Sequence, residues 1–137
     1  MKIVVVDGQG GGIGRGLTEQ FKKRFPQQRL IALGTNSLAT AAMLRAGADQ
    51  GATGDNAICV NVRDADIILG PMGLVLANAM QGEISPRIAL AIGQSPAAKI
   101  LVPVARCQVQ VAGYEEKPMS ALIQDAVDKA AQLLPGA

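Results

Sequence analysis

The stretch "VVVDGQGGGIGRGL", residues 4–17, decides the fold of this 137-residue chain. Consecutive valines are typical of a strand that is buried on both faces, and the Asp7-Gly8 pair after them is turn chemistry. Six of the nine residues from Gly8 to Gly16 are glycine. Glycine loses more backbone entropy on folding than any other residue. So many glycines therefore indicate a loop whose backbone turns tightly or comes close to another group.

Strands and helices alternate from this loop to the end of the chain. We predict strands over 2–7, 29–34, 48–51, 65–70, 98–104 and 108–114, and helices over 13–25, 36–46, 72–80, 85–92 and 118–134. Residues 56–65 suit a short helix capped by Asp55 as well as a strand. This order predicts one α/β domain over residues 1–137, a three-layer Rossmann-like fold with a mostly parallel sheet. The polar–apolar alternation of 108–114 favours an edge strand, with an antiparallel orientation as one option.

Composition narrows the classes of function. Hydrophobic residues make up 49% of the chain and charged residues 18%, as in globular domains. The net charge is +2 with no basic block, and there is no histidine, so we expect neither a nucleic-acid partner nor a metal site. The uncharged residues 67–82 are too short to cross a membrane. The first residues read as a strand, not as a signal peptide, so we expect a cytoplasmic protein in which Cys59 and Cys107 are reduced. Arg106 beside Cys107 leaves a reactive thiol there as an option.

The spacing of the glycines indicates a phosphate loop. The plain dinucleotide-binding spacing G-x-G-x-x-G fails at every glycine, and no Gly-Lys-Ser/Thr follows to make a Walker loop. The spacing G-x-x-x-G-x-G fits Gly8, Gly12 and Gly14. In this position, between a strand and a helix, the motif resembles the cofactor loop of the short-chain dehydrogenase/reductase family, with Asp7 where threonine is usual. The resemblance implies that Gly8 makes the turn, that Gly12 and Gly14 approach a pyrophosphate, and that Gly16 packs against the sheet.

The resemblance to the reductases ends near residue 25. Members of that family need a Tyr-x-x-x-Lys pair for catalysis. The single tyrosine here is Tyr114, and Pro118 stands four residues after it. The loop therefore carries over, and the chemistry of hydride transfer does not.

Candidate binding residues follow the strands, because ligands of open α/β sheets bind beyond the carboxyl ends of the strands. Thr35 and Asn36 stand where NAD sites usually carry an acid; they suit a ribose, or with Arg15 a 2′-phosphate, and equally a helix cap. Asp7 suits an Asx turn or a contact with a ligand hydroxyl or a magnesium-bound water, and Glu83 suits a general base or a solvated acid at a helix start. The predicted site comprises Asp7, Gly8, Gly10, Gly11, Gly12, Ile13, Gly14, Arg15, Thr35, Asn36, Gly70 and Pro71.

Over nearly its full length, including "ADIILGPMG" and "LANAMQGEISP", the chain is similar to a small bacterial family classed as a domain of unknown function. That resemblance implies a stand-alone Rossmann-like protein and no particular substrate. Our leading hypothesis is a protein that binds a nucleotide or dinucleotide, NAD(P) or another adenine nucleotide, and forms a homo-oligomer such as a dimer. Two alternatives stay open. One is a small enzyme for a phosphorylated or nucleotide substrate, with Asp7, Asp55 or Glu83 as the acid–base group. The other is a non-catalytic interaction protein that packs through residues 67–82.

Overall fold

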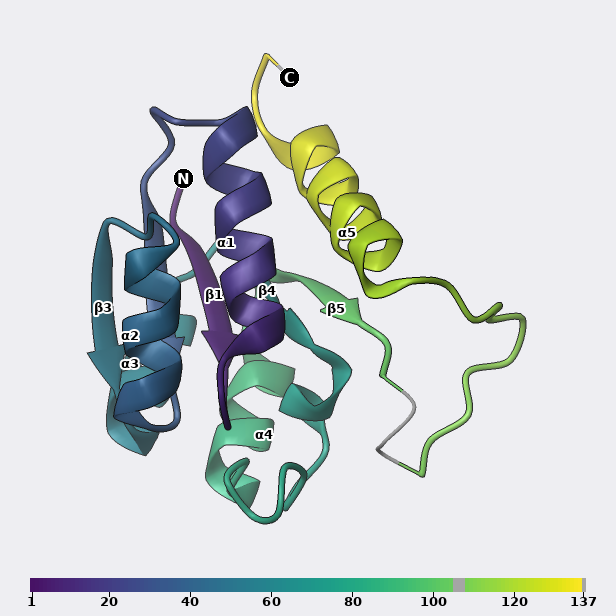
Figure 1. Ribbon diagram of the computed structural model, residues 1–137. Coiled ribbons are helices and arrows are strands. Elements are labelled where there is room, and N and C mark those ends of the chain that lie inside the picture. Colours follow the sequence, from purple (N-terminus) through teal and green to yellow (C-terminus); the bar gives the residue numbers. More distant parts are fainter. Residues whose placement is uncertain (105–107, 137) are drawn as a thin grey trace.

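The computed structural model describes residues 1–104 and 108–136, so Arg106 and Cys107 lie outside the described residues. The sheet is built from β1 (Ile3–Asp7), β2 (Leu30–Gly34), β3 (Gln50–Thr53), β4 (Ile67–Pro71) and β5 (Ala98–Val102). Its strand order is β3-β2-β1-β4-β5, and every neighbouring pair is parallel (Figure 1). The predicted α/β class and parallel sheet are confirmed.

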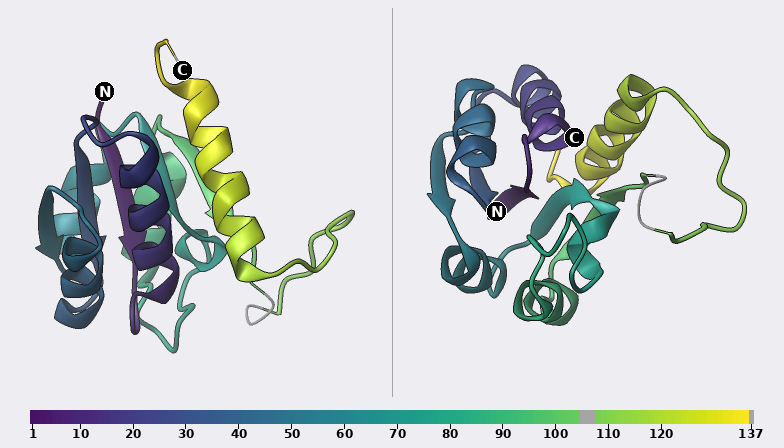
Figure 2. Two further views of the ribbon diagram at one scale, coloured as in Figure 1. Left: turned by 45° about the horizontal axis from the view of Figure 1, so that its top comes forward. Right: turned by 60° about the horizontal axis from the view of Figure 1, so that its bottom comes forward.

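Helices cover both faces of this sheet and complete the three layers. They are α1 (Gly12–Arg24), α2 (Ser37–Arg45), α3 (Asp55–Val62), α4 (Pro86–Gln94) and α5 (Met119–Leu133), with a single turn of 3-10 helix, η1 (Met72–Val75). Helices α1, α2 and α5 pack on one face, and α3 and α4 on the other (Figures 1 and 2). None of the helices in the described ranges is both long and apolar enough to cross a membrane.

Strand β1 is the centre of the core. All five of its residues are buried, because the strand lies between β2 and β4 and has helices on both faces. Ile3 and Val5 contribute to the cluster under α1, α2 and α5, whereas Val4 and Val6 contribute to the cluster under α3 and α4. The valine run at the start of the sequence is thus explained by burial on two sides.

Local signals set most helix boundaries. The side chain of Asn36 accepts a hydrogen bond from the N–H of Ala39 at 2.9 Å and so caps α2, as one of the two predicted readings had it. Ser85 caps α4, with Pro86 in its first turn. The prediction that Asp55 caps α3 is wrong. Gly54 takes the cap position, and Asp55 is the first helical residue, where its charge suits the helix dipole.

Two predicted elements are absent. In place of the predicted helix over 72–80 there is the single turn η1, which ends at Val75. The chain then runs through turns in which Asn78, Met80 and Gln81 have φ of 68°, 56° and 56°. Residues 108–114 form no strand, so the antiparallel edge strand is also wrong. They are exposed and extend away from the body of the protein, so they do not pair with the edge strand β5 (Figures 1 and 2).

The topology places a binding site at one edge of the sheet. The chain builds β1, β2 and β3 outward in one direction, then returns to add β4 and β5 on the other side of β1. The order of the strands therefore reverses between β1 and β4. At such a switch point the loops after the two strands diverge and leave a crevice. The right-hand view of Figure 2 turns this edge toward the reader.

Candidate functional site

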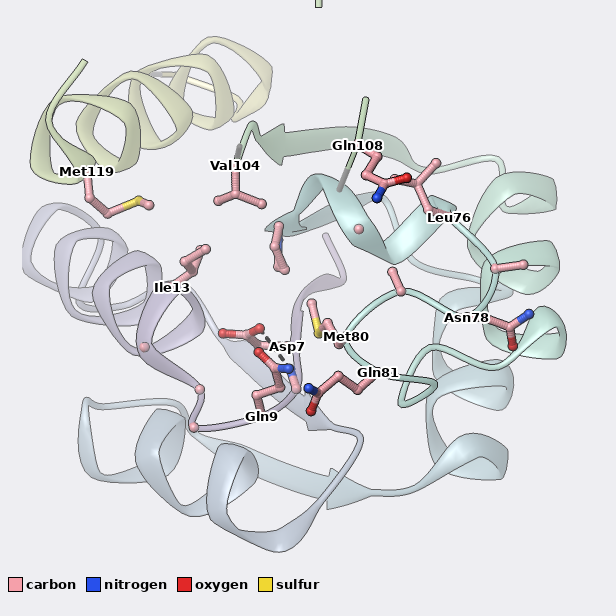
Figure 3. Close-up of a pocket in the computed structure, with 18 residues that line it drawn as sticks. Asp7, Gln9, Ile13, Leu76, Asn78, Met80, Gln81, Val104, Gln108 and Met119 are labelled. Atoms are coloured by element: carbon pink, nitrogen blue, oxygen red, sulfur yellow. Dashed lines mark hydrogen bonds between the residues drawn. The ribbon is translucent and has the colours of Figure 1, made fainter. Parts of the chain in front are cut away.

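A cavity of about 760 Å³ lies at the switch point between β1 and β4. Its walls come from the glycine loop, the segment after β4, the chain after β5 and the start of α5. The lining residues are Asp7, Gly8, Gln9, Gly10, Gly11, Gly12, Ile13, Pro71, Gly73, Leu76, Ala77, Asn78, Ala79, Met80, Gln81, Val104, Gln108 and Met119. Figure 3 shows Asp7, Gln9, Met80 and Gln81 near the centre, with Ile13, Val104 and Met119 on the side toward α1 and α5.

Asp7 fixes the shape of the glycine loop. Its carboxylate accepts hydrogen bonds from the N–H groups of Gly8 and Gly14, each at 2.7 Å. The pKa of Asp7 is raised, chiefly by burial and also by the negative charge of Glu83. The two N–H groups act in the opposite direction and lower it. Asp7 therefore binds amide groups of its own loop as predicted, but not as an Asx turn, because the N–H of Gln9, two residues on, donates to Glu83 instead.

The outer side of the loop carries N–H groups without partners. The N–H of Gly11 donates to the carbonyl of Gly8 at 2.9 Å. Among the described residues, nothing accepts from the N–H groups of Gly10, Gly12 and Ile13. Gly12 and Ile13 begin α1, where backbone N–H groups have no partner within the helix. These three donors belong to residues that line the cavity.

Two of the glycines are required by the fold. Gly11 has φ of 73°, and a Cβ there would lie 2.9 Å from Cα of Ala39 in α2. A Cβ on Gly14 would lie 2.6 Å from Sδ of Met43 and 2.8 Å from Cβ of Asp7. Gly14 thus lets α1 pack against α2 and the end of β1, so its place in the motif has a structural reason.

Gly16 and Gly8 also have neighbours, but different ones from those implied by the reductase loop. A Cβ on Gly16 would lie 2.6 Å from Cδ1 of Ile123, so this glycine faces α5 and not the sheet. A Cβ on Gly8 would lie 2.7 Å from Oγ1 of Thr35 and 3.0 Å from Sδ of Met80. Gly8 is therefore covered by the loops that follow β2 and β4.

Gly10 and Gly12 have no such reason to be glycine. A Cβ at either position would meet nothing within 4 Å. Neither residue has a positive φ. Both line the cavity, and the absence of a side chain leaves their backbone accessible from it.

Glu83 holds three loops together, and we call this set of contacts the Glu83 clasp. Its Oε1 accepts from the N–H of Gln9 at 2.8 Å, from Oγ1 of Thr35 at 2.7 Å and from Nδ2 of Asn36 at 2.9 Å. The bonds from Thr35, Gln9 and Asn36 lower the pKa of Glu83, against a smaller effect of burial. The lowered pKa favours the carboxylate form of Glu83, which anchors the three loops. Its two predicted readings, a general base and a solvated acid at a helix start, stay predictions.

The structure divides the predicted site residues into two groups. Asp7, Gly8, Gly10, Gly11, Gly12, Ile13 and Pro71 line the cavity, and Gly14, Arg15, Thr35, Asn36 and Gly70 do not. Arg15 is exposed on α1, while the side chains of Thr35 and Asn36 donate hydrogen bonds to Glu83. A Cβ on Gly70 would lie 2.5 Å from the carbonyl oxygen of Val6, so Gly70 serves the packing of β4 against β1.

Sequence reasoning missed much of the cavity wall. Gln9, Leu76, Met80, Val104 and Met119 come from four separate segments, and their types suggest ordinary packing or loops. The one available signal was position, since Gln9, Leu76 and Val104 all stand a few residues after a strand end. Met119 carries no such signal, because it begins α5.

The parallel sheet, the helices on both faces and the cavity at the switch point define a three-layer α/β protein with a Rossmann-like architecture. The chain belongs to the family described as Domain of unknown function (DUF3842), whose model matches residues 2–135. A search of curated proteins finds no match, and neither does a search of solved structures. Within residues 1–104 and 108–136, no group of three or more His, Cys, Asp or Glu side chains is placed to hold a metal ion.

Proposed function

We propose that this protein binds a phosphorylated small molecule of the nucleotide class, with the phosphate on the Gly8–Gly14 loop. The observation that carries the proposal is the pair Gly10 and Gly12. Both line the cavity, and neither packing nor backbone conformation requires glycine there. Close approach of a ligand to the backbone is a physical reason for a residue without Cβ at these two cavity positions.

The electrostatics of the loop suit an anion. The N–H groups of Gly10, Gly12 and Ile13 have no acceptor in the described part of the chain, and the N-terminus of α1 adds the positive end of the helix dipole. Asp7 is the charged side chain among the described lining residues. Its charge is compensated by the N–H groups of Gly8 and Gly14, and burial raises its pKa, so it opposes a nearby phosphate only weakly.

A thermal-shift panel tests this proposal. It comprises NAD, NADP, ATP, ADP, FAD, FMN, coenzyme A and S-adenosylmethionine, applied to protein shown to be free of co-purified nucleotide. A ligand at a hundred times its Kd stabilises the folded state by about 2.7 kcal/mol, which gives a clear upward shift of Tm. No shift with any nucleotide of this panel, and none with a nucleoside monophosphate, would overturn the proposal.

The enzyme alternative gains no support from the three carboxylates proposed for it. Asp7 and Glu83 are held by the contacts described above. Asp55 accepts a hydrogen bond from Oγ of Ser85 at 2.6 Å. Each of these acids therefore has a structural partner within the chain, and nucleotide binding is the function that the geometry favours.

A further inference from the structure

We infer that the ligand is a phosphate monoester of mononucleotide size, and that the Glu83 clasp keeps dinucleotides out. This inference rests on the proposed function and assigns the class of ligand and its direction in the cavity. It rests on a difference between the two sides of the glycine loop. The side toward β2 is filled by side chains of the protein, and the side toward β4 and β5 is open.

The β2 side of the loop is where the adenosine half of a dinucleotide binds in doubly wound folds. A residue shortly after β2 then receives the hydroxyls of the adenosine ribose. In this chain the residues at that place are Thr35 and Asn36, and both donate to Oε1 of Glu83. Nδ2 of Asn36 also donates to the carbonyl of Gln9 at 2.9 Å. The groups that would bind a ribose are therefore used within the chain.

The same side is also filled sterically. A Cβ on Gly8 would lie within 3.1 Å of Oγ1 of Thr35, Sδ of Met80 and Oε1 of Glu83. These atoms come from the loops after β2 and β4, which meet directly above the end of β1. The cavity accordingly has no wall made by β2 or α2, and its lining includes neither Thr35 nor Glu83. A ribose there would have to displace the clasp.

The segment that closes this side is held by its own hydrogen bonds. The N–H of Asn78 donates to the carbonyl of Ile84 at 2.6 Å, and the N–H of Ile84 donates back to the carbonyl of Ala79 at 3.1 Å. Ile84 is fully buried in the cluster under α3 and α4. Opening the β2 side would break these contacts as well as the three bonds to Glu83. The folded protein therefore keeps this side closed.

The opposite side is open and mostly apolar, with Gln108 as a polar residue from the chain after β5. Ile13, Leu76, Val104 and Met119 line the cavity from α1, the segment after η1, the chain after β5 and the start of α5. Figure 3 shows Ile13, Val104 and Met119 around one side of the cavity, with the glycine loop near its centre. A phosphate on the loop therefore directs the rest of the ligand toward β4 and β5, where one sugar and one base or a similar organic group meets apolar side chains.

Isothermal titration of the full chain compares two sets of ligands. The first contains inorganic phosphate, ribose 5-phosphate, AMP, GMP, CMP, UMP and nicotinamide mononucleotide; the second contains NAD, NADP and FAD. We expect at least one monoester to bind ten or more times tighter than every dinucleotide. A dinucleotide that binds as tightly as the best monoester would overturn the inference and leave the proposed function standing. If neither set binds, the inference fails, and the proposed function fails with it if ATP, ADP and coenzyme A do not bind either.

Variants of the clasp test the cause of the selectivity. In Glu83→Ala we expect the ratio of dinucleotide to monoester affinity to rise at least tenfold, because the β2 side is released. Thr35→Val removes one bond of the clasp while keeping a side chain of similar shape, and it replaces the first variant if that one does not fold. Glu19→Ala is the matched control, since Glu19 is an exposed carboxylate on α1 away from the cavity. A ratio that stays at the wild-type value in a folded clasp variant would overturn the role of the clasp.

Discussion

The carboxylate of Asp7 and the N–H of Gly14 are joined by a hydrogen bond of 2.7 Å, which ties the end of β1 to the first turn of α1. The same carboxylate accepts from the N–H of Gly8 at 2.7 Å. The glycine loop is thus held from its inner side by the residue that precedes it. Its remaining N–H groups, those of Gly10, Gly12 and Ile13, are left for the cavity.

Asp7→Asn tests this internal anchor. Asparagine offers one oxygen, so one of the two buried N–H groups loses its acceptor and faces an NH₂ group instead. We expect a loss of about 1–3 kcal/mol in the free energy of unfolding, the cost of a buried donor without a partner. Urea denaturation measures it. Asp64→Asn is the control and should have a clearly smaller effect, because Asp64 is exposed and its partner among the described residues is Lys2. Equal effects of the two substitutions would contradict the anchor.

Two glycines of the loop should respond differently to alanine. Gly14→Ala places a methyl group against Sδ of Met43 and Cβ of Asp7, and the second of these cannot move without displacing β1. We expect a loss of about 1–3 kcal/mol from overpacking. Gly16→Ala meets only the terminal Cδ1 of Ile123, which can rotate away, and alanine is favoured over glycine in a helix by about 1 kcal/mol. Urea denaturation should therefore find Gly16→Ala near the wild type, and a larger loss for Gly16→Ala than for Gly14→Ala would refute the packing described.

Gly12→Val separates binding from folding. The position is open to the cavity, so the side chain fits without clashes in the protein but covers the N–H groups of the loop. We expect Tm to stay close to the wild-type value while the shift caused by the best ligand of the panel disappears. Gly93→Val is the matched control, because Gly93 is another helical glycine with nothing within 4 Å of its Cβ position, and it lies in α4 outside the cavity. Unchanged affinity in Gly12→Val would show that the phosphate does not bind on this loop.

The fold was predictable where its causes are local. The valine run, the glycines and Pro26 mark β1 and α1, and Ser85 with Pro86 marks α4, so these elements lie within a residue or two of their predicted bounds. A helix was wrongly predicted over residues 72–80, because they contain helix-forming residues with no breaker between Leu74 and Met80. Beside its local hydrogen bonds, this loop is fastened by the bond from Thr35 to Glu83, 48 residues apart in the chain. No sequence window contains both partners.

The same reasoning explains what was missed of the site. Glycine spacing found the loop, because that loop is one short segment. It gave Gly12 and Gly14 the same role beside a pyrophosphate, whereas the structure shows that Gly14 serves packing and that Gly12 does not. From the sequence, Thr35 was a reasonable ribose ligand, but in the structure its hydroxyl donates to Glu83. Which polar groups are already satisfied is a property of the folded chain.

The predicted homodimer now rests on a different segment. Within residues 67–82, Ile67, Ile68, Leu69 and Leu74 are fully buried in their own chain and offer no surface to a partner, whereas Ala77, Asn78, Gln81 and Gly82 are exposed. Residues 108–114 instead expose Val109, Val111 and Tyr114, which are 40%, 45% and 39% accessible. We expect sedimentation to find a dimer at tens of micromolar, and a Val109→Lys, Val111→Lys double variant to be monomeric. A wild-type protein that sediments as a monomer would end this prediction.

The Glu83 clasp should make part of the stability depend on pH. Hydrogen bonds from Thr35 and Gln9 lower the pKa of Glu83 in the folded state. Such a group stabilises the protein above its ordinary pKa, and this contribution is lost as the pH falls through the lowered value. Asp49, Asp64 and Asp128 also have lowered pKa values because each accepts hydrogen bonds, so the wild-type profile alone does not isolate Glu83.

The difference between the wild type and Glu83→Gln isolates it. Glutamine keeps an acceptor but has no charge, so the variant is less stable at neutral pH by about 1 kcal/mol or more, as for hydrogen bonds to a charged group. The gap should be constant down to about pH 4.5, the ordinary glutamate value, and should shrink below it as Glu83 takes up a proton. Urea denaturation of both proteins across this range measures the gap. A gap that grows on acidification has the wrong sign for a hydrogen-bonded carboxylate and would show that Glu83 is not ionised in the clasp.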